Sequence, residues 1–434
     1  MLAADSAVRA YPDGHDELGA LFARFVKGIF DINADSYTDD GIPFLRILNL
    51  RRGVIDESNL ARIPEAIHQS ERKTELRRGD IVLSKTACPA ASLVTVDFCN
   101  TSQDTIATTL SSYGLNHYKP EAIVAYLNSS IGEQLLWRQF QGNVQLHLSL
   151  DDGRKVPIPR LSPNFQANIA LFFQNAESAR KSSLRQFEVA SRLLERALGL
   201  ENWQAPELLS YVRNSSDTFA ARRLDAEFFN PGIDQLLKRL SCDGQKIRDV
   251  APARKERFTR NETGEFYYIE IGALNSDGTA ESQCILQREA PSRATQHVRT
   301  NDVITSTVRP NRRLSALISE QQDGFVCSSG FVVLQPKQIS GDVLVTYLRL
   351  PIICKLMDLY TSASMYPAIS ESDLLNLPVP KFSTATEKAV EQSLQSARLA
   401  KQRAAHLLES AKRAVEIAIK QSEEAALTYL EANS

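Results

Sequence analysis

The longest regular pattern in the chain is an apolar stripe at helical spacing, and it occurs twice. Apolar residues recur every three or four positions over residues 165–200 and again over residues 383–430. This period places the apolar side chains on one face of a helix. We therefore predict two long helices over these ranges. Their stripes include Phe173, Leu184, Phe187 and Leu194 in the first and Leu394, Leu408 and Val415 in the second.

A helix of about 35 residues is roughly 50 Å long and cannot cover its own apolar stripe. Two such helices can cover each other by pairing as a coiled coil. The alternative is that each helix packs only against the globular segment that precedes it. We favour pairing, because we expect nothing after residue 430 to cover the stripe of the second helix.

In the segments that precede the two long helices the pattern changes to short runs of β-branched and aromatic residues. Residues 80–84, 303–306 and 330–334 are such runs, each bounded by Gly, Asn, Asp or Pro, as strands commonly are. Helical spacing returns at 121–140 and 340–360, so each globular segment is predicted to be α+β. The predicted domains are residues 1–164 and 222–382, with long helices at 165–200 and 383–430 and a polar connector at 201–221.

The two halves of the chain repeat each other at a nearly constant offset. Asp80 and Asp302 begin similar strands, and the later pairs Tyr126-Leu127 and Tyr347-Leu348 match at almost the same separation. The Pro-x-Pro segments at 157–159 and 378–380 keep that separation as well. Three matches at almost one offset indicate a duplicated unit of one globular domain and one long helix.

Composition bounds the class of protein without fixing its ligand. The net charge is −2 with 24% charged residues, and the six cysteines form no Cys-x-x-Cys pair, so neither a disulfide framework nor a metal site is expected. Residues 46–85 and 246–313 are locally basic, which permits nucleic-acid binding on chosen faces. No signal peptide or membrane-spanning run is visible in the sequence, so we expect a cytoplasmic protein without membrane contact.

The loops after the two equivalent strands carry the candidate binding residues. Arginine, asparagine and glutamine side chains match guanine and adenine edges through paired hydrogen bonds, and others grip phosphates. The alternative is a surface loop with solvated side chains. The candidates for DNA binding are Arg51, Arg52, Ser84, Lys85, Thr86, Asn143 and Gln145 in the first half, and Ser306, Thr307, Arg309, Asn311, Arg312, Arg313, Ser364 and Tyr366 in the second.

Sequence motifs for catalysis are not found. The chain has no phosphate-binding Gly-x-x-x-x-Gly-Lys-Ser/Thr loop, no Asn/Asp-Pro-Pro-Tyr/Phe methyltransferase motif and no Gly-x-Ser-x-Gly elbow. Asp80 with Lys85 is a weak nuclease candidate, and the second copy has Thr307 at the lysine position. We therefore interpret Asp80 and Asp302 as strand-start residues and expect no catalytic centre.

The order of these motifs resembles one known family. Two variable α+β domains, each closed by a Pro-x-Pro segment and a long helix, are similar to the specificity (S) subunits of type I restriction–modification systems. The resemblance covers nearly the whole chain. The segments that carry it are residues 79–84, 126–129, 156–159, 223–229 and 377–380.

The resemblance implies a fold and a set of partners. It implies two target-recognition domains related by pseudo-twofold symmetry and joined by two long antiparallel coiled-coil helices. Each domain is expected to read half of a split site in double-stranded DNA. The helices are expected to dock two methyltransferase (M) subunits and, through them, restriction (R) subunits, and the seven stripe residues named above are the expected partner-binding residues. S-adenosylmethionine, ATP and Mg²⁺ are then used by those partners, and this chain binds no cofactor itself.

Two other functions remain open from the sequence alone. One is a coiled-coil scaffold or adaptor protein of a related defence system, whose globular units bind protein. The other is an enzyme with an unrecognised nuclease site. Sequence-selective duplex binding favours the DNA-reading subunit over both, and metal-dependent cleavage by the chain alone favours a nuclease.

Overall fold

The computed structural model describes residues 2–32, 34–142, 146–204, 206, 208–362 and 367–434. The chain divides into two compact units. Unit 1 comprises Met1–Lys181 and Ala400–Ser434, and unit 2 comprises Ser182–Leu399. The division falls within the two long helices and not in the connector. Helix α7 (Pro163–Ala197) and helix α14 (Thr384–Lys420) are each divided, with one part in unit 1 and the other in unit 2.

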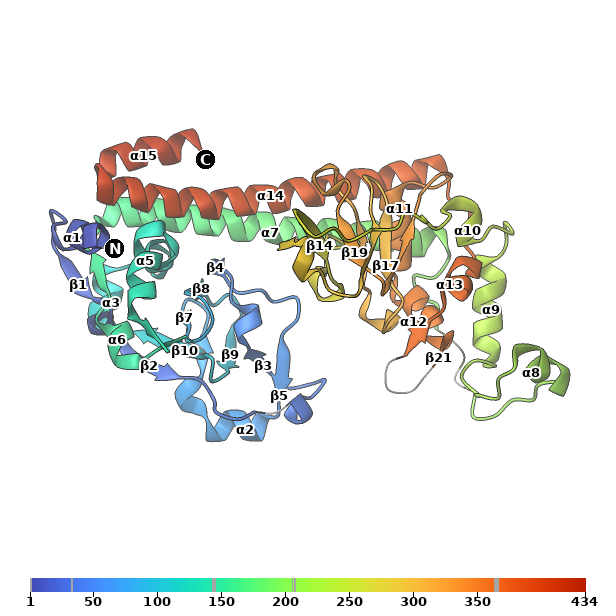
Figure 1. Cartoon of the computed structure of the whole chain (residues 1–434). Helices are drawn as coiled ribbons and strands as arrows, with labels where there is room; N and C mark the ends of the chain where they lie inside the picture. The colour runs from blue at the N-terminus through green and yellow to red at the C-terminus, as the bar shows by residue number, and fades with distance from the viewer. Residues whose placement is uncertain (1, 33, 143–145, 205, 207, 363–366) are drawn as a thin grey trace. The chain divides into compact units, whose positions relative to one another are not determined.

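Unit 1 contains two main sheets (Figure 1). The five-stranded sheet has the order β2 (Phe22–Lys27), β10 (Thr105–Leu110), β7 (Ile81–Ser84), β8 (Ala91–Leu93) and β4 (Gly53–Val54). The four-stranded sheet has the order β5 (Ala61–Ile63), β3 (Ile42–Leu45), β9 (Phe98–Thr101) and β6 (Leu76–Arg77). Short pairs join β1 (His15–Glu17) to β13 (Pro157–Pro159) and β11 (Phe140–Gln141) to β12 (His147–Leu148).

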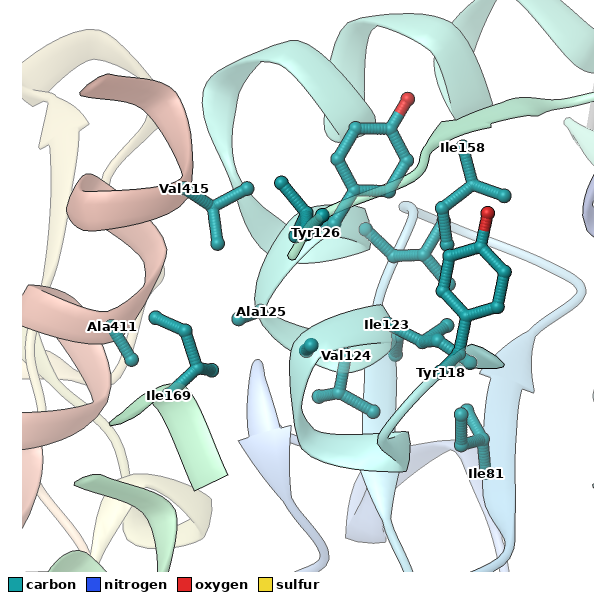
Figure 2. Close-up of a cluster of buried hydrophobic side chains, with 14 of the residues drawn as sticks. Ile81, Tyr118, Ile123, Val124, Ala125, Tyr126, Ile158, Ile169, Ala411 and Val415 are labelled. Atoms are coloured by element: carbon teal, nitrogen blue, oxygen red, sulfur yellow. The ribbon is translucent and has the colours of Figure 1, made fainter. Parts of the chain in front are cut away.

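Most helices of unit 1 pack on one face of the five-stranded sheet and form its core, whereas α2 (Glu65–Ser70) packs against the four-stranded sheet. The helices are α1 (Leu2–Arg9), α2, α3 (Ser112–His117), α4 (Pro120–Asn128), α5 (Ser130–Gln139), α6 (Leu150–Arg154) and α15 (Glu423–Ala432), besides the parts of α7 and α14. Figure 2 shows Tyr126 and Ile123 of α4 with Ile158 of β13 and Val415 of α14. All four side chains are buried. Globular domain and long helices therefore share one hydrophobic core in this unit.

Unit 2 repeats this architecture. Its sheets have the orders β18 (Ser315–Leu317), β17 (Val303–Ser306), β20 (Phe331–Leu334), and β15 (Gln283–Leu286), β14 (Glu265–Ile269), β19 (Val326–Ser328), β16 (Ala294–His297). A hairpin joins β21 (Thr361–Ser362) to β22 (Ala368–Ile369). The helices are α8 (Ser215–Ala221), α9 (Pro231–Leu240), α10 (Ile247–Val250), α11 (Gly341–Leu348), α12 (Pro351–Leu359) and α13 (Glu371–Asn376).

Strand pairing confirms the predicted duplication. The four-stranded sheet has a central parallel pair in both units, β3 with β9 and β14 with β19, flanked on each side by an antiparallel strand. Strand β7 lies between β8 and β10, as β17 lies between β18 and β20. The predicted α+β class is likewise confirmed for both units.

The repeated sequence motifs contact each other in the same way in both units. The buried Tyr126 hydroxyl donates a hydrogen bond to the Pro157 carbonyl at 2.5 Å, and the buried Tyr347 hydroxyl donates to the Pro378 carbonyl at 2.7 Å. A buried hydroxyl requires a partner. The tyrosine therefore fixes the Pro-x-Pro segment from which the long helix starts.

Asp80 and Asp302 also have the predicted structural role at the start of a strand. The Asp80 carboxylate accepts the Arg77 backbone N–H at 2.9 Å, and the Asp302 carboxylate accepts that of Arg299 at 2.8 Å. Each also faces an arginine, Arg24 at 3.7 Å and Arg254 at 2.6 Å.

The long helices pair antiparallel, as predicted (Figure 1). In unit 1, the start of α7 and the end of α14 share a core, and the Ser162 N–H before α7 donates to Glu423 after α14 at 2.8 Å. In unit 2, the Ser183 hydroxyl of α7 donates to the Ala397 carbonyl of α14 at 2.8 Å. The alternative in which each helix packs only against its own globular domain is wrong, since Ala411 and Val415 of the second helix lie in the core of unit 1.

The apolar stripe serves mainly this internal packing. Phe173, Leu194, Leu394 and Val415 are buried, and Phe187 and Leu408 are partly buried against the cores of their units. Their expected role as a docking surface for partner subunits is therefore corrected, because buried side chains offer no surface. Leu184 differs, with 46% of its surface exposed.

The second long helix ends earlier than predicted. It stops at Lys420 instead of continuing to residue 430, and α15 begins after it. The Ser422 hydroxyl accepts the Ala425 N–H at 3.2 Å and so caps a new helix. Among the described residues, no helix combines the length and the apolar character needed to cross a lipid bilayer.

Candidate nucleic-acid interface

In unit 2 the loop after β17, residues 307–314, is hydrogen-bonded to a hairpin. The Arg309 N–H donates to the Pro367 carbonyl at 2.9 Å, and the Ile369 N–H donates to the Thr307 carbonyl at 3.0 Å. Arg309 and Arg313 both have left-handed backbones, with φ of 51° and 57°, on either side of the turn Pro310–Arg312. This sharp turn brings Asn311, Arg312 and Arg313 to the surface together.

Arg349 holds the backbone of this loop in place, a role that the sequence did not predict. Its guanidinium donates to the Arg313 carbonyl at 2.7 Å, to the Ser315 carbonyl at 3.0 Å and to the Ser276 carbonyl. Burial lowers the pKa of Arg349. Its guanidinium thus binds backbone carbonyls. Its position in the predicted helical stretch 340–360 did not indicate that it would hold a loop in place.

The exposed side chains of the loop are free to meet a ligand. Arg312 and Arg313 are exposed, and neither forms an ion pair with any residue that the structure describes. Asn311 beside them is also exposed. Two guanidinium groups and one amide on a fixed turn can present paired hydrogen-bond donors to base edges or phosphates.

Ser306 and Thr307 do not belong to this exposed group. Ser306 is buried, and its hydroxyl donates to the Val308 carbonyl at 2.9 Å and accepts the Val308 N–H at 3.1 Å. The Thr307 hydroxyl donates to the Gly330 carbonyl at 3.1 Å. Ser306 is therefore corrected to a structural residue. Thr307 is only partly buried, so its role as a DNA contact stays a prediction.

In unit 1 the equivalent loop, residues 85–90, has the same setting. The Leu148 N–H of the hairpin donates to the Lys85 carbonyl at 2.8 Å, and Thr86 pairs with His147. Ser84 is buried, with its hydroxyl bonded to the Cys88 carbonyl at 2.7 Å and to the Ala90 N–H at 2.8 Å. Thr86 is buried as well. Ser84 and Thr86 are thus corrected to structural residues, and Lys85 remains accessible.

In each unit a hairpin contacts the loop after the equivalent strand. Asn143 and Gln145 of unit 1, and Ser364 and Tyr366 of unit 2, lie outside the described residues. The hairpin strands on either side of them, however, contact the loops after β7 and β17. Segments that are distant in the sequence therefore form one surface in each unit.

Arg51 and Arg52 are engaged within unit 1. Arg51 pairs with Asp56 at 3.1 Å and donates to the Leu48 carbonyl at 2.9 Å. Arg52 forms a two-bond pair with Glu133 of α5, one bond being 2.8 Å long. Their side chains are about half exposed, but a phosphate would have to compete with these carboxylates.

The weak nuclease candidate does not form a site. Asp80 precedes the first residue of β7 and Lys85 follows the last one. Five residues of extended chain separate the two by about 16 Å. Asp80 is also bound to Arg77 and Arg24, so the pair cannot act together on one phosphate.

Comparisons with known proteins give similarity in structure only. No protein-family model matches the chain, and no curated protein matches it either. Solved structures similar to it include the type I restriction–modification S subunit from M. genitalium, at 12% identity and a TM-score of 0.35 over 97% of this chain and 96% of that one. They also include the HsdS subunit from Thermoanaerobacter tengcongensis, at 15% identity and a TM-score of 0.28 over 98% of each chain. A chain from a structure of the type I R-M system matches at 16% identity and a TM-score of 0.28, over 97% of this chain and 98% of that one.

Proposed function

We propose that this chain is the sequence-specificity subunit of a type I restriction–modification complex, with each unit reading one half of a bipartite DNA site. One observation carries the proposal: a single α+β unit occurs twice, and in each copy a fixed loop and a hairpin meet at the end of the same strand. A bipartite target needs two readers of one design that differ in their side chains.

The loop of unit 2 supplies the chemistry for direct reading of bases. An arginine matches the O6 and N7 acceptors of guanine, and an asparagine matches the N6 and N7 groups of adenine. Arg312, Arg313 and Asn311 present these groups on a turn that Arg349 already holds in place. Because the loop is ordered before binding, little of the binding free energy is lost in fixing it.

Catalysis is assigned to partner subunits in this proposal. Two M subunits bind S-adenosylmethionine and methylate adenine, R subunits use ATP and Mg²⁺, and an adenine extruded from the duplex enters an M subunit. Since most of the apolar stripe is buried, M subunits are expected to contact the polar outer faces of α7 and α14 and exposed residues such as Leu184.

The test is selection of bound duplexes from a random-sequence pool, with and without a co-expressed adenine methyltransferase. A two-part motif with a fixed gap supports the proposal. Exchange of residues 307–314 for residues 85–90 should then change one half of the motif and leave the other intact. Binding that ignores sequence under both conditions favours the scaffold function, and metal-dependent cleavage by the chain alone favours a nuclease.

A further inference from the structure

Two lysines lie at the same end of the five-stranded sheet of unit 1, where two of its strands finish. Strands β2 and β7 are both antiparallel to β10, so they run in the same direction and end together. Lys27 is the last residue of β2, and Lys85 directly follows β7. Lys27 lies opposite Ile106, which lies opposite Leu83, so the two lysine-bearing strands are on the order of 10 Å apart.

Both lysines also lie on the same face of the sheet. Side chains alternate along a strand, so Lys27 shares a face with Phe25, and Lys85 shares one with Leu83. Phe25 and Leu83 belong to the core cluster that contains Ile106 between them. Both lysines therefore lie at the border of this core, next to the hairpin that contacts the β7–β8 loop.

The charge of this lysine pair is not neutralised by direct contact with a described carboxylate. In the part of the chain that the structure describes, neither Lys27 nor Lys85 takes part in an ion pair. Burial lowers the pKa of Lys85, and the nearby Lys27 lowers it further, whereas Asp104 acts in the opposite direction. Holding two partly buried cations together opposes folding unless an anion joins them.

An exposed aromatic ring completes the cluster. Phe30 is 70% exposed, and the Lys27 ammonium lies 4.6 Å from the centre of its ring. A large apolar side chain so exposed gains little from the fold itself. Beside two cations it offers an apolar surface to the sugar or base that adjoins a phosphate.

We infer that Lys27, Lys85 and Phe30 form a binding site for a phosphate of the DNA backbone. The inference rests on the proposed function and deepens it, because it names residues that position unit 1 on the duplex independently of sequence. The described residues of unit 2 do not repeat this site. Thr307 takes the place of Lys85. The pairing of Ala253 with Leu334 places Lys255 at the position of Lys27, but Lys255 forms an ion pair with Glu371.

The experiment measures the salt dependence of binding of the full-length chain to a random-sequence duplex. Each phosphate contact adds about 0.9 to the slope of log affinity against log salt concentration. The double variant Lys27→Gln/Lys85→Gln should therefore lose about two contacts. Between 50 and 200 mM salt, wild-type affinity should fall about tenfold more than that of the variant. Phe30→Ala should weaken binding without changing the slope.

The matched control is Lys155→Gln/Lys181→Gln, which removes two exposed lysines of unit 1 that already pair with Asp152 and Glu177. It should keep the wild-type slope. An unchanged slope for Lys27→Gln/Lys85→Gln, or an equal reduction in the control, overturns the inference while the proposed function stands. A wild-type chain that binds no duplex overturns both.

A second measurement does not depend on the folding of a variant. Lysine acylation of the wild-type chain, read by mass spectrometry, should be suppressed at Lys27 and Lys85 by the random-sequence duplex and remain unchanged at Lys155. Equal labelling of all three lysines with and without duplex contradicts the inference.

Discussion

The loops after β7 and β17 begin from the same strand in the duplicated fold and differ in length and charge. The loop of unit 1 has six residues between the strands, and the loop of unit 2 has eight. Unit 1 presents a lysine there, and unit 2 presents Arg312, Arg313 and Asn311 on a left-handed turn. In both units a hairpin pins the loop. The fold thus keeps the position of the surface constant and leaves its chemistry free to differ.

This difference suggests a division of work between the units. Ammonium groups act as point charges and suit phosphates, whereas planar guanidinium groups suit paired acceptors on a base edge. Unit 1 would then contribute more to salt-dependent affinity, and unit 2 more to discrimination between bases. Matched substitutions at equivalent positions can break or sharpen this comparison.

The largest difference is expected at the aspartates that begin the two strands. Asp302 is 3% exposed and binds Arg254 through two bonds of 2.6 and 3.0 Å, so Asp302→Ala leaves a partly buried cation and should cost about 3–5 kcal/mol. Asp80 lies 3.7 Å from Arg24, and burial raises its pKa, so Asp80→Ala should cost only about 1–2 kcal/mol.

Hydrogen exchange measures this pair of effects, because it reports β7 and β17 separately. Amides of β17 should lose protection in Asp302→Ala far more than those of β7 in Asp80→Ala. Equal losses in the two variants would mean that the arginine geometry does not distinguish the units.

The second prediction concerns the exposed loop of unit 2 and rests on the proposed function. Arg312→Ala should reduce discrimination at one base pair by about 1–3 kcal/mol and leave the other half-site unchanged. Competition between duplexes that differ at single positions measures this. The control Arg288→Ala removes an exposed arginine of the same unit that pairs with Glu289, and its selectivity should match that of wild type. Uniform weakening at all sequences would assign Arg312 to phosphate instead.

The third prediction tests what the units share. Tyr126→Phe and Tyr347→Phe each leave a proline carbonyl in the core without its donor, which should cost about 1–2 kcal/mol in either unit. Hydrogen exchange within each unit should show equal losses. A clear inequality would mean that the repeated contact supports only one of the long helices.

Sequence alone predicted the elements whose periodicity and repetition are long. The stripes predicted the paired helices, and the matches at 126 and 347 and at the Pro-x-Pro segments identified pairs that contact each other. It could not predict the parallel pairing of β3 with β9, because such short strands carry no signal of their partners.

Individual site residues were harder to predict, for a local physical reason. A serine or threonine after a strand can face solvent or turn back to the main chain, and Ser84, Thr86 and Ser306 are buried. Ser422 caps a new helix although serine also occurs within helices. Lys27 could not be grouped with Lys85 from the sequence, because only the register of β2, β10 and β7 brings the two lysines close together.

The smallest effect is expected where unit 1 has a charge pair that unit 2 lacks. Asp16 accepts two bonds from Arg160, at 2.9 and 2.7 Å, and at the equivalent positions unit 2 has Gln245 and Lys381. The Arg160 hydrogen bonds, helped by those of Tyr118 and Tyr113, lower the pKa of Asp16 to about 2. A lowered pKa stabilises the fold above the ordinary aspartate pKa, and this contribution disappears as the pH falls through about 2.

Since Arg160 is about half exposed, solvent screening limits the gain, and Asp16→Asn should cost about 1 kcal/mol at pH 6 and nothing near pH 2. Urea unfolding across this range, with Asp13→Asn as an exposed control, measures it. A cost for Asp16→Asn that does not change with pH would show that the amide disturbs packing and that the charge pair contributes nothing.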